Sequence, residues 1–179
     1  MYAAFLIFAS IAFVLAQFYQ DRYDIVHDRM EVQDHNNSFL LRPNIQAVYY
    51  NKSMKMKVLN ASGFVTSPLK NNIMMDFKFY RFASGAYRII PFNITIDLCD
   101  QLKRNMFGLS SIVQYSNFRG CPFPGGLLYL RYYPIEQDKF PPFLPLGKYK
   151  LSITVHVNDG HWFVGITNWY GSLVAKGRN

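Results

Sequence analysis

Residues 96–126 read IDLCDQLKRNMFGLSSIVQYSNFRGCPFPGG, and this stretch holds both cysteines of the chain, Cys99 and Cys121. Apolar and polar residues alternate up to the first cysteine, as in a half-buried strand. Apolar residues then recur every four positions until Gly108, which predicts about two turns of amphipathic helix capped by Asp100. If the two thiols pair, they close strand, helix and the following turn into one unit, with a stabilisation of roughly 3 kcal/mol.

Whether the two cysteines form a disulfide or remain unpaired, buried thiols depends on the cellular compartment of the protein. Residues 2–16, YAAFLIFASIAFVLA, carry no charge and are shorter than the roughly 20 residues of a membrane-spanning helix. They end in a small-residue site of the kind that signal peptidase accepts. We therefore expect a signal peptide at 1–16, a mature chain beginning at Gln17 and a secreted, extracellular product; an uncleaved anchor and a buried helix are the alternatives. In an oxidising compartment Cys99 and Cys121 are predicted to form a disulfide.

Four N-glycosylation motifs of the form Asn-x-Ser/Thr agree with secretion. Each motif is short and often arises by chance, but four of them behind a secretory leader are a stronger signal. The four acceptors are Asn36, Asn51, Asn60 and Asn93. Asn93 and Thr95 also share the predicted polar face of the strand before Cys99. The sequence therefore predicts a glycoprotein.

Strand signals recur along the chain with turns at regular spacing and few helical stretches, which favours a sandwich or barrel of antiparallel strands. Residues 17–43 show no strong period and predict a lead-in with at most one edge strand. A long alternating run covers Ile73–Phe79. The clearest alternation, Tyr149–Val157, is followed by the turn residues Asn158–Gly160 and a returning run, His161–Tyr170, which predicts a hairpin.

We expect one domain, residues 17–179, and its net charge of +8 is spread along the chain. No basic cluster or aromatic RNA-binding signature accompanies the charge, so nucleic acid is not an expected partner. A basic secreted surface suits anionic lipid headgroups or acidic glycans, and solubility alone explains the charge equally well. A membrane surface or a receptor is a further candidate partner.

The sequence offers few residues for catalysis. The four histidines form no metal-binding pair at helical spacing, and none lies beside a cysteine or converging carboxylates. The sequence contains no Gly-x-Ser-x-Gly elbow and no glycine loop that would cradle a phosphate. We therefore predict a protein that is not an enzyme and that needs no cofactor or metal.

The prominent feature is instead the large number of aromatic and methionine residues: 16 Phe, 13 Tyr, 2 Trp and 7 Met. Its ordinary explanation is a closed hydrophobic core. The alternative is a cavity, because Met and Phe are adaptable linings for an irregular apolar ligand. The candidate lining residues lie on one face of three predicted strands: Met75, Phe77, Phe79, Ile96, Leu151, Ile153 and Val155.

The segment Pro134–Gly147 contains four prolines, which exclude a central strand and predict an extended surface loop. The loop carries Phe140, Phe143 and Leu144, although surface connections are normally polar. These side chains either fold under the loop as a small satellite cluster or guard one end of the space between the sheets. In the second case they would contact a membrane or the tail of a ligand, and the fixed proline angles would limit the entropy lost on binding.

Three motifs together resemble a known family: Ile96-Asp97-Leu98-Cys99, then Ser116-Asn117 with Cys121-Pro122 and Gly125, then Leu144-Pro145-x-Gly147-x-Tyr149. They resemble an insect-expanded family of small secreted proteins, mostly of unknown function, that includes the chemosensory CheB-type proteins of flies. That family is distantly similar to the ganglioside-activator and ML lipid-recognition domains. The resemblance covers roughly residues 44–168.

This resemblance implies an all-β, immunoglobulin-like antiparallel sandwich with one short helix after Cys99 and an apolar pocket between the sheets. It also implies a non-enzymatic role in binding a lipid or pheromone-like molecule. The chain departs from ML domains in having cysteines for only one disulfide, and ML ligand contacts follow no motif that transfers to numbered positions here. We therefore expect a secreted binding protein for an apolar or amphipathic small molecule; an extracellular protein–protein interaction module with a filled core is the rival.

Overall fold

The structure is a computed structural model that describes residues 19–51, 53, 56–69, 72–157 and 161–177. The predicted signal peptide, residues 1–16, and the predicted mature terminus, Gln17, lie outside the described residues. The turn Asn158–Gly160 also lies outside them.

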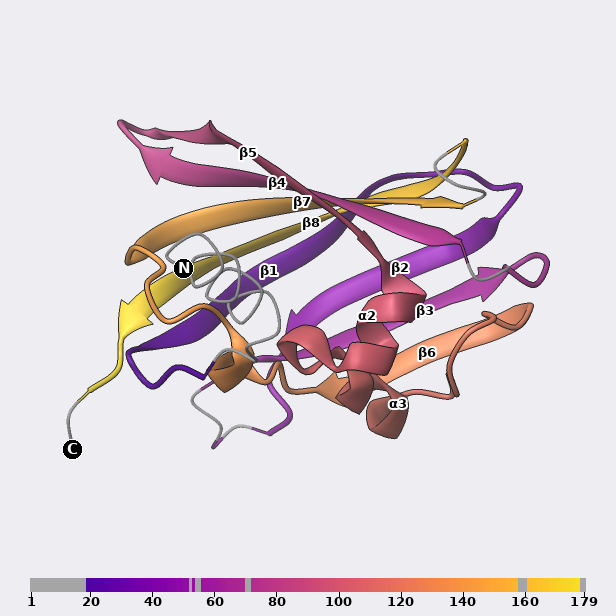
Figure 1. The fold of residues 1–179 in the computed structure, drawn as a ribbon, viewed down its shortest axis with the longest axis horizontal. Helices are drawn as coiled ribbons and strands as arrows, with labels where there is room; N and C mark the ends of the chain where they lie inside the picture. The colour runs from indigo at the N-terminus through magenta and orange to yellow at the C-terminus, as the bar shows by residue number, and fades with distance from the viewer. Residues whose placement is uncertain (1–18, 52, 54–55, 70–71, 158–160, 178–179) are drawn as a thin grey trace, which may run out of the picture.

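Two antiparallel sheets pack face to face (Figure 1). The larger sheet has five strands in the order β1 (Tyr23–His35), β8 (Trp162–Ala175), β7 (Gly147–Val157), β4 (Ile73–Ala83) and β5 (Ala86–Asp97). The smaller sheet has three strands in the order β2 (Leu40–Val48), β3 (Val58–Val65) and β6 (Gly126–Tyr133). The predicted all-β sandwich is thereby confirmed, as are the strands expected around Ile73–Phe79 and the hairpin partners β7 and β8.

Between β5 and β6 the chain forms short helices that lie over the small sheet (Figure 1). They are α2 (Leu98–Arg104), the 3-10 helix η1 (Met106–Ser111) and α3 (Ile112–Tyr115). The helix predicted after the strand is confirmed, but its cap is Asp97, whose side chain accepts the Asp100 N–H at 3.0 Å. The prediction that Asp100 caps the helix is wrong; its carboxylate pairs with Arg104 at 3.0 Å instead.

The helix also ends earlier than predicted. Asn105 adopts a left-handed conformation at φ 52° and its N–H bonds to carbonyls of the last turn. Asparagine tolerates this conformation better than other residues with a β-carbon. Gly108, the predicted stop, is left-handed too, but it lies inside η1.

Strand β1 is longer than its sequence indicates, because eleven of its thirteen residues pair with β8. Tyr23, Ile25 and His27 point inward and are buried. Register shifts follow at His27/Arg29 and Val32/Asp34. Each shift moves the inward-facing positions by one residue, so the sequence loses the period of two that marks a strand.

Two hydrophobic clusters are found among the described residues; the first joins the two sheets, and the second lies on the large sheet beneath the proline-rich loop. The first joins Val65, Leu69, Ile73, Cys99, Val157 and Val164. The second joins Tyr23, Ile25 and Leu173, with Phe140, Tyr149 and Trp169 packed against them. In the part of the chain that the structure describes, no helix is long and apolar enough to cross a membrane.

Candidate functional site

A cavity of about 260 Å³, partly open to solvent, lies between the two sheets and beneath the helices that follow β5. Three parts of the fold supply its walls. The large sheet contributes Val32 and Thr167, which are direct partners across β1 and β8. The small sheet and the helical segment contribute the remaining residues: Leu40, Pro43, Asn44, Ile45, Ala61, Ser62, Gly63, Val65, Leu98, Leu102, Ile112, Ser116, Phe118, Phe123, Leu128, Tyr129 and Leu130.

The pairing within the small sheet explains the shape of one wall. Ala61 pairs with Leu130, and Gly63 pairs with Leu128, so small residues of the central strand lie opposite large ones of its neighbour. A β-carbon on Gly63 would come within 2.8 Å of a Leu40 methyl. Gly63 therefore lets the Leu40 side chain pack directly on the central strand, and Ala61 presents only a methyl group to the cavity.

The disulfide fixes the helical segment as a cover over this wall. Cys99 and Cys121 are bonded, with their Cα atoms 5.8 Å apart, which confirms the predicted disulfide. Cys99 is buried in the larger hydrophobic cluster, and Leu98 and Leu102, one helical turn apart, both line the cavity. We refer to residues 98–123 as the lid. The disulfide joins the two ends of the lid to each other, so the lid is held as a closed unit by this bond as well as by packing.

The dipeptide Ser116-Asn117 attaches the lid to the free edge of β6. Asn117 donates from Nδ2 to the Leu127 carbonyl at 2.7 Å and accepts the Tyr129 N–H at 2.9 Å. Ser116 forms a bridge with Leu130, and its hydroxyl donates to the Ile112 carbonyl at 2.8 Å. These bonds explain why the lid follows the edge of β6 and does not stand free.

The cavity wall carries no charge. None of its lining residues is Asp, Glu, Lys, Arg or His, and its polar side chains are Asn44, Ser62, Ser116, Tyr129 and Thr167. Burying an unpaired charge is costly, so a wall of this composition favours an uncharged occupant. In the described residues, no group of three or more His, Cys, Asp or Glu is arranged to hold a metal ion.

The seven predicted lining residues do share the inner face of the large sheet. The register places Met75 opposite Val155 and Ile96, and Phe77 opposite Ile153. Phe79 lies opposite Leu151, and all seven are partly buried. None of them lines the 260 Å³ cavity, whose contacts with the large sheet are Val32 and Thr167, on β1 and β8.

The apolar residues of the proline-rich loop lie in different environments. Phe140 packs on the second hydrophobic cluster and lies 5.6 Å from the Phe107 ring. Phe143 is 78% exposed, with the Arg22 guanidinium 5.2 Å from its ring, and Leu144 is exposed too. Phe140 thus belongs to a satellite cluster, whereas Phe143 and Leu144 face solvent.

A buried histidine lies at the end of the sandwich where β1 begins. His27 Nδ1 accepts the indole N–H of Trp169 at 2.8 Å, so the neutral ring carries its proton on Nε2. Burial lowers the pKa of His27 to about 4; the charge of Asp28 opposes this shift and the charge of Lys57 adds to it, both to a smaller extent. The sequence gives His27 no distinctive signal, because the register shift that follows it interrupts the alternation of inward-facing and outward-facing residues in β1.

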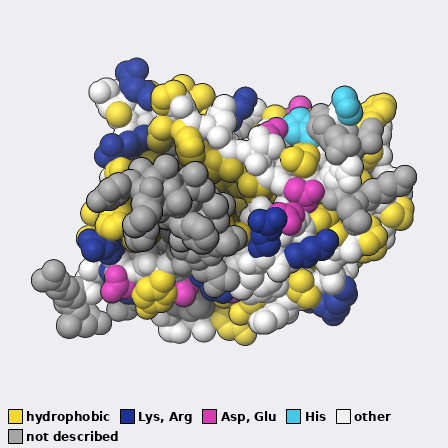
Figure 2. Space-filling view, viewed as in Figure 1, with side chains coloured by type: hydrophobic (Ala, Val, Ile, Leu, Met, Phe, Trp, Pro, Cys, Tyr) yellow, Lys and Arg dark blue, Asp and Glu magenta, His cyan; other side chains and the backbone are white. Residues whose placement is uncertain are grey.

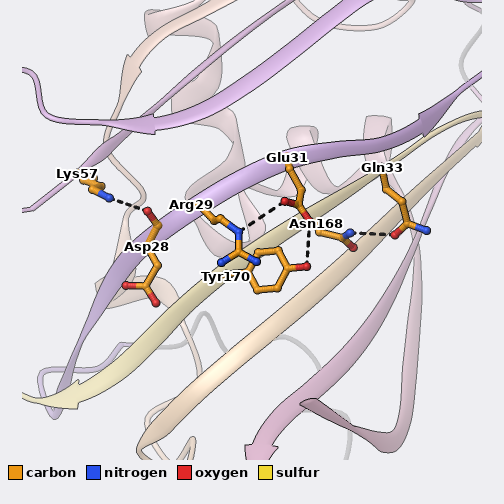
Figure 3. A network of polar contacts seen from close by, with 7 residues as sticks. All are labelled: Asp28, Arg29, Glu31, Gln33, Lys57, Asn168 and Tyr170. Carbon is orange, nitrogen blue, oxygen red and sulfur yellow. Dashed lines mark hydrogen bonds and ion pairs between the residues drawn. The ribbon is translucent and has the colours of Figure 1, made fainter. Parts of the chain in front are cut away.

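The outer face of the large sheet carries charge that the cavity lacks (Figure 3). Tyr170 donates its hydroxyl to Glu31 at 2.9 Å, and the Arg29 guanidinium lies 3.7 Å from the Tyr170 ring. The hydrogen bond from Tyr170 lowers the pKa of Glu31. Asn168 donates to Gln33 at 2.8 Å in the same network. Polar side chains therefore cover the solvent side of the sheet where β1 and β8 pair.

The four glycosylation acceptors differ in accessibility. Asn51 and Asn93 are exposed. Asn36 is half-buried and donates from Nδ2 to the Phe163 carbonyl at 3.2 Å. Asn60 is also half-buried and accepts a backbone N–H from β6. The folded protein therefore presents Asn51 and Asn93 most openly.

A protein-family model matches part of the chain. Residues 73–151 match the family described as "Protein of unknown function (DUF1091)". The match runs from the start of β4 through the lid and β6 into β7, so it includes both cysteines. No curated protein matches the chain.

Proposed function

We propose that the protein is a secreted, non-enzymatic binding protein for an apolar or amphipathic small molecule, a lipid or a pheromone-like compound, held between its two sheets. The observation that carries the proposal is the cavity of about 260 Å³ with an uncharged, mainly apolar wall. The disulfide supports secretion, because disulfides persist in oxidising compartments. The similarity to a family of unknown function is compatible with the proposed relationship to CheB-type and ML lipid-recognition proteins.

The volume of the cavity limits the size of the ligand. An apolar cavity of roughly 150 Å³ binds benzene, and drug-sized ligands occupy roughly 300–1,000 Å³. A cavity between these limits suits an occupant of about ten non-hydrogen atoms. An amphipathic ligand would place its apolar part inside and its charged group, if it has one, at the surface.

Displacement of a fluorescent apolar dye by 1-decanol tests the proposal. Ala61 lines the cavity at the centre of the small sheet, so Ala61→Phe should fill the space and weaken decanol binding about tenfold or more, a loss of about 1.4 kcal/mol. Ala175→Phe adds the same ring at an exposed position and should bind as the unmodified protein does. Ala61→Leu serves if the larger side chain prevents folding.

Two results would contradict the proposal: decanol failing to displace the dye, or both phenylalanine variants binding decanol equally. Native mass spectrometry of the secreted protein gives a second test, since a carrier should retain co-purified apolar molecules.

One observation favours the rival function, a protein–protein interaction module. Leu41, Phe64 and Leu127 are direct partners across the three strands of the small sheet, and all three are exposed on its outer face. Exposed apolar rows of this kind mark interaction surfaces. Under this alternative, Phe64→Ser would abolish association with the partner, and Ala61→Phe would leave it unchanged.

A further inference from the structure

The hairpin of β4 and β5 extends beyond the strand beside it. Pairing between β4 and β7 ends at Arg81 and Tyr149, so the hairpin tip, residues 82–87, has no partner on that side. Figure 1 shows the tip projecting at the upper left, past the start of β7. Arg81 donates from Nη2 to the Leu146 carbonyl at 3.3 Å, which ties the tip to the proline-rich loop. We call residues 78–92 and 143–150 together the hairpin corner.

The hairpin corner is uniformly basic. Its two segments contain Lys78, Arg81, Arg88, Lys148 and Lys150, and neither contains Asp or Glu. Arg81 and Arg88 are direct partners across the hairpin. Like charges placed directly opposite each other destabilise a sheet, and an anionic partner would offset that repulsion.

Exposed apolar side chains alternate with these cations along the hairpin, because the pair Arg81–Arg88 projects from one face and the pairs Phe82–Tyr87 and Tyr80–Ile89 project from the other. Phe82 is 41% exposed, Ile89 58% and Phe92 57%. Lys150 Nζ lies 5.2 Å from the Tyr80 ring, so aromatic and basic groups are interleaved on the same surface. Figure 2 shows Lys and Arg beside hydrophobic side chains at the upper left, with no acidic side chain drawn among them.

We propose that the hairpin corner docks on an anionic lipid bilayer. Basic side chains contact anionic headgroups while apolar and aromatic ones enter the interface, a combination used by proteins that lie on membranes. An acidic glycan would use the cations and gain little from Phe82, Ile89 and Phe92. The hairpin corner contains none of the residues that line the cavity. Membrane docking and ligand binding can therefore be tested separately.

Co-sedimentation with vesicles tests the docking. The secreted protein should bind phosphatidylcholine/phosphatidylserine (7:3) vesicles, bind pure phosphatidylcholine much more weakly, and release from the mixed vesicles at high salt. Arg81→Gln with Arg88→Gln should weaken binding roughly 20-fold, because each cation near an anionic membrane contributes substantially. The same double variant should melt close to the unmodified protein, because relief of the Arg81–Arg88 repulsion offsets the loss of the exposed hydrogen bond from Arg81 to Leu146.

The matched control is Arg42→Gln with Lys103→Gln, which removes the same charge from exposed positions on β2 and α2 and should bind as the unmodified protein does. Phe82→Ser with Ile89→Ser should also weaken binding while leaving its salt dependence. Equal loss in the control would overturn the proposal, because net charge alone would then explain binding. So would equal binding to both vesicle types or no vesicle binding. Retention on heparin without vesicle binding would assign the corner to acidic glycans instead.

Discussion

The lid and the hairpin corner lie at opposite ends of β5, and they differ in how far their apolar side chains are covered. At the lid, α2, the disulfide and the Ser116–Asn117 contacts cover the apolar side chains, and the result is an uncharged interior space. At the hairpin corner no element covers Phe82 and Ile89 fully, and each is preceded in its strand by an arginine. Whether apolar residues near an end of β5 are buried or exposed therefore depends on which elements pack against that end.

The largest expected effect comes from removing the covalent part of the lid. Cys99→Ala with Cys121→Ala should cost about 2–5 kcal/mol of unfolding free energy, measured by urea denaturation. Amide exchange should accelerate in α2 more than in β7 and β8, because the disulfide holds only the lid. Equal acceleration throughout would show that the lid is not a separate unit, and unchanged stability would show that packing alone holds it.

A second test concerns the end of the sandwich where β1 begins. Gly171 lies opposite His27 and Tyr149, and a β-carbon there would meet the Trp169 ring and the Val26 carbonyl oxygen. Gly171→Ala should therefore cost about 1–3 kcal/mol through overpacking.

Gly177→Ala is the control for that substitution, because nothing lies near its added methyl. Thermal denaturation should separate the two variants clearly. A Gly171→Ala protein that melts with the unmodified protein would mean that Trp169 does not hold its position over this strand.

The buried His27 predicts a dependence of stability on pH. Its folded pKa of about 4 lies below the unfolded value near 6.5, so between these values the unfolded state binds the proton that the folded state excludes. Stability should therefore fall as the pH drops, by about 2 kcal/mol between pH 7 and pH 5. Carboxylates with lowered pKa values, such as Glu31, lose their contribution only at lower pH.

Urea denaturation at pH 7 and pH 5 measures this dependence. His27→Gln keeps an acceptor for the Trp169 N–H and should remove most of the difference between the two pH values. A variant with the full pH dependence would place its origin elsewhere.

The smallest effect on stability is expected in the proline-rich loop. Phe143 is exposed, so Phe143→Ser should change the unfolding free energy by no more than about 0.5 kcal/mol. Phe140→Ser, in contrast, removes a ring packed on the second cluster and should cost about 1–3 kcal/mol. Vesicle binding should fall only in Phe143→Ser. If the two variants melt alike, the assignment of one ring to the core and the other to the surface is wrong.

The sequence predicted the regular elements well. Strict alternation identifies β4 and β7, and the two cysteines predict the closure of the lid. Alternation also groups Phe77 with Ile153 correctly, but it does not say which part of that face the second sheet and the lid will enclose. The edge strand expected within residues 17–43 is β1, but its bounds could not be read from the sequence because its register shifts break the alternation. The function of Asn117 depends on β6, which follows it in the chain, so local pattern gave no sign of it.

The central claim is that an uncharged ligand occupies the cavity beneath the lid. Methyl-resolved NMR of the protein titrated with 1-decanol tests it most directly. The account predicts saturable shifts of the Leu102, Ile112 and Leu128 methyl signals, because these residues line the cavity. Absence of saturable shifts, or shifts confined to Leu151 and Ile153 on the remainder of the inner face, would contradict it.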